Sequence, residues 1–177
     1  MIKLTDFVHR YDNIIKKEVC EEIINQKDLK FNLATVSGGK VNKHRNCLVK
    51  PIEKKFDNKI QKIISKIIQL YMEDHKHFGP GMNSIEDTGY EHLLYLGSHK
   101  GEYKEHVDHV ELFPRILSIS ILLNDNYEGG NFSFFNGQHI IEKKQGSAVI
   151  FPSNFCFPHA VLPVTKGDRH SIITWIH

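Results

Sequence analysis

Two histidines and one aspartate stand at a spacing that could hold a metal ion. His106 and Asp108 are separated by one residue, and His159 follows in a later segment. Two imidazole nitrogens and one carboxylate can occupy one face of an octahedral ion and leave the opposite face open, which is the ligand set of non-haem Fe(II) oxygenases. Because this set contains no thiolate, it argues against a structural zinc site. We therefore predict that His106, Asp108 and His159 bind Fe(II).

An H-x-D triplet alone is weak evidence, since the chain contains 12 histidines. The predicted strands strengthen it: alternation along a strand places His106 and Asp108 on one face, and His159 opens another strand. Cys156 is the competing ligand, but its neighbours Phe155 and Phe157 favour a buried apolar position.

Arg169 follows His159 after one strand and a Lys-Gly-Asp turn. A guanidinium can bind a carboxylate through two hydrogen bonds, and it keeps its charge when it is desolvated. Ser171 and Trp175 stand at alternate positions after Arg169, so the three side chains share one face of the predicted strand. We expect Arg169 to bind a dicarboxylic cosubstrate, with Ser171 as a further donor.

Two helices and a series of short strands position these residues. Helical spacing of apolar residues predicts helices over 12–26, capped by Asp12 or Asn13, and over 56–78, ended by Gly79-Pro80-Gly81. Residues 31–52 predict a strand, a turn and a second strand. Eight further strands are expected, with Asn136-Gly137 as the sharpest hairpin signal; they cover 90–96, 103–107, 115–123, 130–135, 139–141, 147–151, 158–164 and 169–176.

This order of elements predicts a mainly β fold with supporting helices and a double-stranded β-helix (jelly-roll) core. We expect a single domain over residues 1–177, in which 1–89 form a helical buttress and lid region and 90–177 form the core. The polar or glycine-rich segments 37–45 and 77–88 could each close over a substrate, and ordinary surface loops explain them nearly as well.

The composition indicates which kinds of partner and compartment to expect. A net charge of +2 gives no strong footprint for nucleic acid, and the lysines of residues 40–55 fit a solvated loop. Three unpaired cysteines, together with the lack of a signal-like or membrane-length apolar run, predict a cytoplasmic protein without a membrane contact.

Four segments resemble the iron(II)- and 2-oxoglutarate-dependent dioxygenases, in the prolyl 4-hydroxylase-like branch labelled PKHD-type. They are YLGSHKGEYKEHVDH, RILSISILLNDNYEGGNFSFF, KKQGSAVIFP and HAVLPVTKGDRHSIITW. The resemblance implies an enzyme that uses Fe(II), 2-oxoglutarate and O2, with ascorbate as a reductant, and hydroxylates a prolyl residue in a protein or peptide with release of succinate and CO2. Because Asp108 keeps the carboxylate ligand, it implies hydroxylation and not halogenation.

The resemblance also assigns roles to residues. His106, Asp108 and His159 would be the catalytic iron ligands, and Arg169 would bind the distal carboxylate of 2-oxoglutarate with Tyr95 beside it. One departure concerns Leu122, where the family often has a tyrosine that reaches the cosubstrate, and Ser171 or Tyr95 could cover that role. Residues that could line the substrate mouth are Arg45, Arg115 and Trp175.

Two alternatives stay open at this stage. One is a member of the same superfamily that oxidises a nucleic acid or a small molecule. The other is a metal-binding, cupin-like module without catalysis, against which Arg169 argues because such a module needs no carboxylate anchor. The sequence leaves the substrate and the oligomeric state undetermined.

Overall fold

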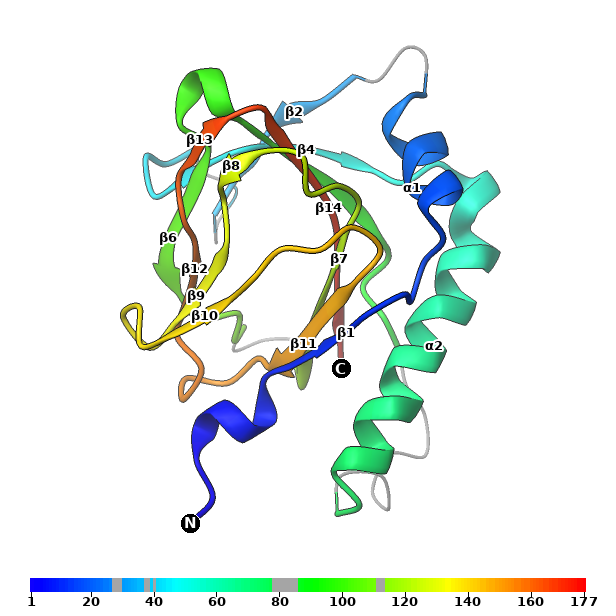
Figure 1. The fold of residues 1–177 in the computed structure, drawn as a ribbon, viewed down its shortest axis with the longest axis vertical. Helices are drawn as coiled ribbons and strands as arrows, with labels where there is room; N and C mark the ends of the chain where they lie inside the picture. Colours follow the sequence, from blue (N-terminus) through cyan, green and yellow to red (C-terminus); the bar gives the residue numbers. More distant parts are fainter. Residues whose placement is uncertain (27–29, 37–38, 40, 78–85, 111–113) are drawn as a thin grey trace.

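The computed structural model describes residues 1–26, 30–36, 39, 41–77, 86–110 and 114–177. They form a β-rich body with two α-helices on one side of it (Figure 1). The helices are α1 (Lys17–Ile24), α2 (Asp57–Asp74) and the short 3-10 helices η1 (Leu4–Phe7), η2 (Lys54–Phe56) and η4 (Gly97–His99).

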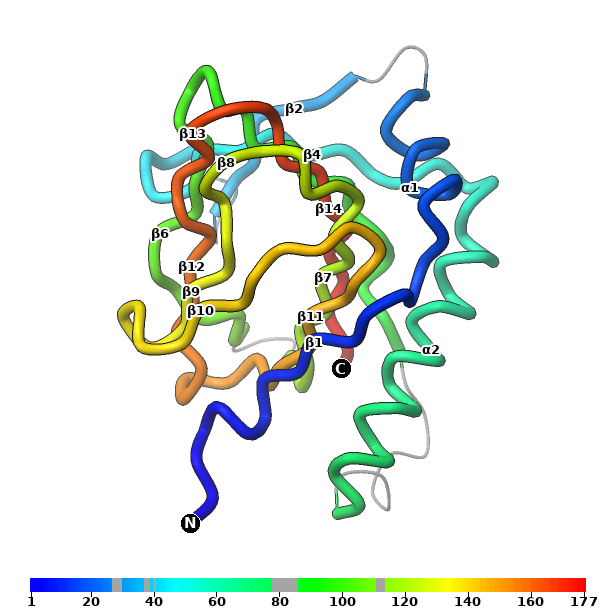
Figure 2. The backbone as a smooth tube through the Cα atoms, in the orientation of Figure 1, coloured from blue at the N-terminus to red at the C-terminus, as the bar shows by residue number. Residues whose placement is uncertain are grey.

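Most strands belong to two antiparallel sheets that together form a barrel, whose closed outline is visible along the backbone (Figure 2). The seven-stranded sheet runs in the order β1 (His9–Tyr11), β11 (Ala148–Pro152), β7 (Leu117–Leu122), β14 (Asp168–Ile176), β5 (Glu91–Leu96), β4 (Leu48–Pro51) and β2 (Asn32–Leu33). The five-stranded sheet runs in the order β10 (His139–Ile141), β9 (Phe132–Phe134), β12 (His159–Val161), β6 (Glu102–His106) and β3 (Arg45–Asn46). A further pair joins β13 (Val164–Lys166) to β8 (Glu128–Gly129). The predicted fold class, mainly β with supporting helices around a jelly-roll core, is confirmed.

Strand alternation divides the apolar side chains into two cores. On β7, Leu117, Ile119 and Ile121 pack under the helices with the apolar face of α2. Leu122, which points to the opposite face of β7, belongs to the second core, which fills the barrel between the sheets. Strand β14 follows the same rule, because Ile172 lies in the helix-covered core whereas Ile173 lies inside the barrel. The inward positions of these two strands also carry polar side chains, because Ser120 on β7 and Arg169 and Ser171 on β14 line a cavity inside the barrel.

The first predicted helix was placed too early, because α1 begins at Lys17 and not near Asp12. Ile14 and Ile15 are buried as the pattern required, but their backbone amides both donate to the carbonyl of Gly146 at 2.8 and 3.2 Å. These hydrogen bonds hold Ile14 and Ile15 against Gly146 of the barrel, and the helix begins only after them. The second predicted helix is confirmed as α2, but it ends at Asp74, earlier than the predicted end.

Two predicted strands also differ from the structure. The strand expected over 158–164 is divided into β12 and β13, with Pro163 between them, because proline has no amide hydrogen to continue the ladder. The strand expected over 103–107 ends at His106, so Asp108 lies beyond it. The hairpin at Asn136-Gly137 is confirmed, since β9 and β10 pair directly across it.

The first 89 residues contribute strands as well as helices. β1 pairs with β11, β4 pairs with β5, and β3 pairs with β6, so this region is built into both sheets. The expected lid segments include residues 37, 38, 40 and 78–85, and the helix end at Gly79-Pro80-Gly81 falls there too; these positions lie outside the described residues. Within the part of the chain that the structure describes, no helix is long and apolar enough to cross a membrane.

Candidate metal centre and carboxylate anchor

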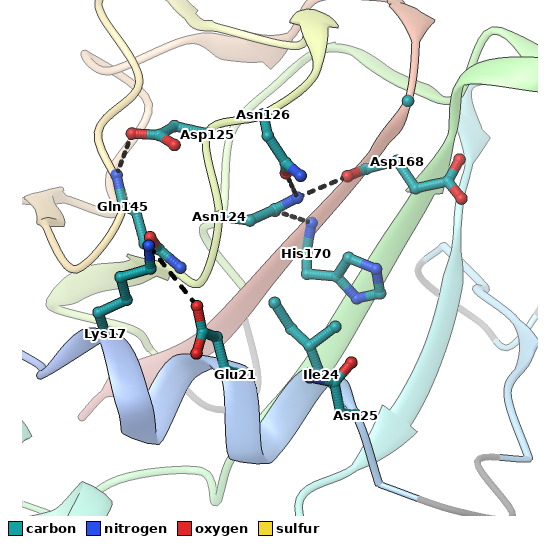
Figure 3. A pocket seen from close by; sticks show the side chains of 11 residues that line it. Lys17, Glu21, Ile24, Asn25, Asn124, Asp125, Asn126, Gln145, Asp168 and His170 are labelled. Atoms are coloured by element: carbon teal, nitrogen blue, oxygen red, sulfur yellow. Dashed lines mark hydrogen bonds and ion pairs between the residues drawn. The ribbon is translucent and has the colours of Figure 1, made fainter.

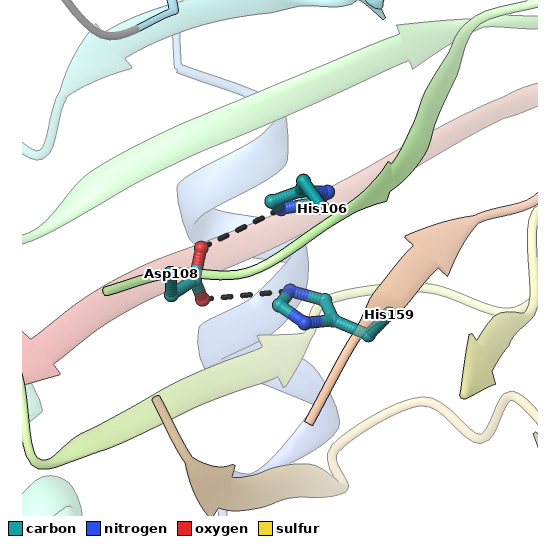
Figure 4. A group of neighbouring side chains, drawn as sticks. All are labelled: His106, Asp108 and His159. Carbon is teal, nitrogen blue, oxygen red and sulfur yellow. Dashed lines mark ion pairs between the residues drawn. The ribbon is translucent and has the colours of Figure 1, made fainter. Parts of the chain in front are cut away.

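The three predicted metal ligands meet at one end of the barrel. One donor atom from each of His106, Asp108 and His159 lies within 4.8 Å of the other two. The Nε2 atoms of His106 and His159 are each 3.5 Å from a different oxygen of Asp108 (Figure 4). The carboxylate thus stands between two imidazoles, as one divalent ion bound by all three would require.

Backbone carbonyls orient both imidazoles. Nδ1 of His106 lies 2.8 Å from the carbonyl of Lys104, and Nδ1 of His159 lies 3.1 Å from that of Phe157. A carbonyl oxygen only accepts hydrogen bonds, so each Nδ1 donates and each Nε2 is left with a free lone pair. This is the tautomer that a metal ligand needs.

The carboxylate of Asp108 is fixed from behind by a buried serine pair. Ser118 Oγ donates to Asp108 Oδ2 at 2.7 Å, and Ser118 Oγ lies 2.8 Å from Ser153 Oγ. Burial raises the pKa of Asp108, but the neighbouring imidazoles outweigh this effect and hold the pKa well below its usual range. Burial lowers the pKa of His106, against the opposing influence of Asp108. The site therefore favours a carboxylate beside a neutral His106.

Tyr103 is a site residue that the sequence pattern did not reveal. Its ring stacks on the imidazole of His106, with the centroids 3.4 Å apart and the planes 16° from parallel. Residues three apart on a regular strand point to opposite faces, which hides this contact. The register shifts between β12 and β6, because His159 pairs with His106 whereas Val161 pairs with Tyr103. This irregularity brings both rings to one side.

Arg169 lies inside the barrel and is only 1% exposed. Nη1 donates to Ser171 Oγ at 2.9 Å, and the guanidinium carbon lies 4.9 Å from the ring centre of Tyr95 and 5.2 Å from that of Phe132. Its Nε and Nη2 atoms are buried without a hydrogen-bond partner, and no carboxylate among the described residues forms an ion pair with it. A buried cation in this state is costly unless an anion joins it.

One cavity brings most of the predicted site residues together. Arg169, Ser171 and Trp175 reach it from alternate positions of β14, and Tyr95 reaches it from β5. Its lining also includes the metal triad, Arg45 and six residues that sequence reasoning missed or left unassigned: Leu93, Tyr103, Ser120, Phe132, Val161 and Ile173. Serines at alternate positions of the apolar strand β7, Ser118 and Ser120, were the available signal for a polar interior.

Arg115 does not line this cavity, but it contacts Trp175, which does. The guanidinium carbon of Arg115 lies 3.7 Å from the centre of the Trp175 ring, and its Nη1 donates to the backbone carbonyl of Asp108 at 3.3 Å. Arg45 packs similarly over Tyr103 at 5.1 Å and donates from Nη1 to the carbonyl of Thr35. The predicted substrate residues are therefore close to the triad, each supported by an aromatic ring.

A separate polar hollow of about 530 Å³ lies where α1 faces β14 and the loop after β7 (Figure 3). Asn124 connects its walls: Nδ2 donates to the carbonyl of Asp168 at 2.8 Å, and Oδ1 accepts from the amide of His170 at 2.8 Å (Figure 3). These two hydrogen bonds hold the backbone on either side of Arg169. The hollow contains none of the triad residues, and neither does an apolar cavity of about 700 Å³ beside Tyr71 and Ile116.

The sequence of the barrel matches known proteins. Residues 91–177 match the model of the 2OG-Fe(II) oxygenase superfamily. A PKHD-type hydroxylase of Psychrobacter sp. (strain PRwf-1) is 36% identical over 75 residues, which are 40% of this chain and 28% of that protein. Another, from Alteromonas mediterranea, is 38% identical over 64 residues, 34% of this chain and 27% of that protein. The match thus spans less than a third of either relative.

Solved structures share the whole fold. A viral collagen prolyl hydroxylase from Paramecium Bursaria Chlorella virus-1 superposes with a TM-score of 0.71 at 19% identity, over 96% of this chain and 95% of that one. A prolyl hydroxylase from Trichoplax adhaerens, solved with a peptide of hypoxia inducible factor, gives 0.76 at 20% identity, over 97% and 84%. At these identities the likeness concerns the fold. The match over residues 91–177 relates the sequence of the barrel to the 2OG-Fe(II) oxygenase superfamily, and the solved structures show that the chain has the prolyl hydroxylase fold.

Proposed function

We propose that the protein is an Fe(II)- and 2-oxoglutarate-dependent dioxygenase that hydroxylates a prolyl residue of a protein or peptide. The observation that carries this proposal is the buried Arg169 guanidinium, which has two unpartnered donor atoms and shares one cavity with the His106–Asp108–His159 triad. A metal site without catalysis would not need a buried cation beside it. A dicarboxylic cosubstrate supplies the missing anion.

The residues fit both groups. His106, Asp108 and His159 would hold Fe(II) as two imidazoles and a carboxylate, the set that suits this ion. Arg169 would hold the distal carboxylate of 2-oxoglutarate, with Tyr95 and Ser171 beside it. When bound, Fe(II) and 2-oxoglutarate supply the activation of O2, and the products are the hydroxylated substrate, succinate and CO2.

The protein's own contribution is geometric and electrostatic. The Lys104 and Phe157 carbonyls keep both imidazoles in the metal-binding tautomer, and Ser118 keeps the carboxylate in place. Phe132 and the ring of Tyr95 cover the guanidinium of Arg169 and exclude water from it. Interactions inside such a dry cavity are stronger than in water.

Two arginine–aromatic pairs support a peptide as the substrate. Arg115 on Trp175 and Arg45 on Tyr103 lie beside the triad and are both partly buried. Their remaining donors suit the backbone carbonyls of an extended peptide, and the flat rings suit a proline ring. The named hydroxylases among the relatives and structural neighbours favour the prolyl substrate over a nucleic acid or a small molecule.

Further parts of the proposal rest on simpler observations. The described cysteines, Cys20, Cys47 and Cys156, are all free thiols, which supports a reducing compartment and hence the cytoplasm. Ascorbate is proposed as the reductant that restores Fe(II) after turnover without substrate. Because the N-terminal strands belong to the same sheets as the barrel, we propose that residues 1–177 act as one domain.

The test is a screen of proline-containing peptides with purified protein, Fe(II), 2-oxoglutarate and O2. We expect one peptide to gain the mass of one oxygen atom on proline, with equimolar succinate. Omitting 2-oxoglutarate should abolish both signals, and the variant Asp108→Ala should show neither. Oxygen incorporation that persists without 2-oxoglutarate, or that Asp108→Ala retains, would refute the proposal.

A further inference from the structure

The loop that follows β7 is fastened to the backbone around Arg169. Asn124 bonds to the backbone of Asp168 and His170, as described above, and its Nδ2 also donates to Asn126 Oδ1 at 2.8 Å (Figure 3). The next residue, Tyr127, lies directly against Gly167, where a Cβ atom would come within 3.2 Å of the Cα and Cβ atoms of Tyr127. The loop thus holds Tyr127 beside the start of β14.

The side chain of Tyr127 points into the barrel core. It is only 4% exposed and belongs to the same apolar cluster as Tyr95 and Phe132, the rings that cover Arg169. Gly130 makes room for its ring, because a Cβ atom there would approach Tyr127 Cε2 to 2.8 Å. Packing on several sides therefore fixes the direction of the hydroxyl.

That hydroxyl lies beside a cation, and its proton has no acceptor. Burial raises the pKa of Tyr127, whereas the charge of Arg169 and the close contact with its guanidinium lower the pKa. No well-aligned hydrogen bond reaches the Tyr127 hydroxyl from the described residues, and the same is true of Nε and Nη2 of Arg169. Buried tyrosine hydroxyls normally find a partner.

The chemistry of the two groups indicates what is missing. A guanidinium only donates hydrogen bonds, so Arg169 cannot accept the proton of the Tyr127 hydroxyl. Ser171 Oγ already accepts from Arg169. Leu122, directly opposite Ser171 in the sheet, has no polar group to offer. An anion with several free lone pairs satisfies the donors of both Arg169 and Tyr127, and a carboxylate has this form.

We infer that Tyr127 is a cosubstrate-binding residue, whose hydroxyl donates to the distal carboxylate of 2-oxoglutarate alongside Arg169. This inference rests on the proposed function and assigns a hydroxyl that Leu122 cannot supply. It predicts that Tyr127 recognises the second carboxylate of the cosubstrate and contributes nothing to the end of the molecule that faces the metal.

The test compares two ligands that differ only at that carboxylate. 2-Oxopentanoate has a methyl group where 2-oxoglutarate has its distal carboxylate, so it is the internal control for metal-side binding. Affinities of both acids are measured anaerobically by titrating the visible charge-transfer band of the Fe(II)-loaded protein. The proteins are the wild type, Tyr127→Phe, and Tyr90→Phe as a matched control, because Tyr90 donates to Asp87 outside the cavity.

For Tyr127→Phe we expect the affinity for 2-oxoglutarate to fall roughly tenfold to hundredfold, as for a lost hydrogen bond to a charged group. The affinity for 2-oxopentanoate should stay unchanged, and Tyr90→Phe should bind both acids like the wild type. Equal losses for both acids, or no loss for either, would overturn the role of Tyr127. A wild type that binds both acids equally, or neither of them, would overturn the proposed anchor at Arg169 as well.

Discussion

Ser118 Oγ donates a hydrogen bond to Asp108 Oδ2 at 2.7 Å and thereby fixes the only carboxylate of the triad. Ser118 stands on β7, and Ser153, 2.8 Å away, follows β11, so two strands of the large sheet support this ligand from behind. The proposed metal centre thus relies on residues outside the triad to hold its carboxylate in place. Such supporting contacts orient a ligand before the ion arrives.

Ser118→Ala should weaken metal binding roughly tenfold to hundredfold without abolishing it, since Asp108 keeps its charge but loses its orientation. Competition of Mn(II) or Fe(II) against a chelating dye measures this affinity. Ser65→Ala is the control, because Ser65 lies on the exposed surface of α2 and bonds only to a local carbonyl. Equal metal affinity in Ser118→Ala and the wild type would contradict the supporting role.

Arg169→Met should raise the stability of the protein without cosubstrate. The wild type buries an unpaired guanidinium, and its replacement by an apolar side chain of similar length is expected to add about 1–3 kcal/mol. Urea unfolding should show this gain, whereas Arg10→Met should show none, because Arg10 is exposed and paired with Asp12.

The same variant should lose its response to 2-oxoglutarate. Mn(II) with 2-oxoglutarate stabilises the wild type by mass action, and Arg169→Met should gain little from the pair at equal concentration. If Arg169→Met were less stable than the wild type and still responded fully to 2-oxoglutarate, then the guanidinium would serve the fold and not the ligand.

Strands β14 and β6 show where strand alternation in the sequence predicts the site correctly and where it does not. Alternation placed Arg169, Ser171 and Trp175 on one face of β14, and the cavity contains all three because that strand is regular. Alternation failed on β6, where the register shift brings Tyr103 to the same side as His106. A β-bulge depends on pairing with a strand that is distant in the sequence, so the local pattern of residues does not predict it.

The position of Tyr127 in the site could not be predicted from the sequence for a related reason. Its place beside Arg169 depends on Asn124 and Gly167, which join a loop to a strand far along the chain. The first helix illustrates the same limit. The apolar spacing placed Ile14 and Ile15 in the first turn of a helix, but in the structure their amides donate to the distant carbonyl of Gly146. Local periodicity gave the burial of these residues correctly and their backbone conformation incorrectly.

Stability should fall as the pH drops below about 6.5, partly because of His92. Burial lowers the pKa of this histidine to about 3, with His170 and Lys50 acting in the same direction. Between about pH 6.5 and 3 the unfolded chain binds a proton on this imidazole and the folded chain does not, so protonation favours unfolding. At pH 5 the cost should be about 2 kcal/mol.

Urea unfolding at pH 7 and pH 5 measures this difference. His92→Gln should lose less stability between the two values than the wild type, whatever its stability at pH 7. His99→Gln should keep the wild-type dependence, because His99 is exposed. An unchanged dependence in His92→Gln would show that other groups cause the loss.

Metal binding should persist below the ordinary pKa of histidine. An imidazole must be neutral to bind a metal, and burial lowers the pKa of His106, so protons compete for it only at lower pH. When Mn(II) binding is titrated against pH, its midpoint should therefore lie below about 6.5, which is the ordinary pKa of histidine. A midpoint at or above that value would contradict the burial effect.

The most direct test of the account is an anaerobic titration of the Fe(II)-loaded protein with 2-oxoglutarate, followed by the visible charge-transfer band. We predict a saturable band in the wild type, no band in Asp108→Ala, and a much weakened affinity in Arg169→Met. A wild-type protein that binds Fe(II) but develops no band with 2-oxoglutarate would contradict the claim that the triad and Arg169 form one cosubstrate site.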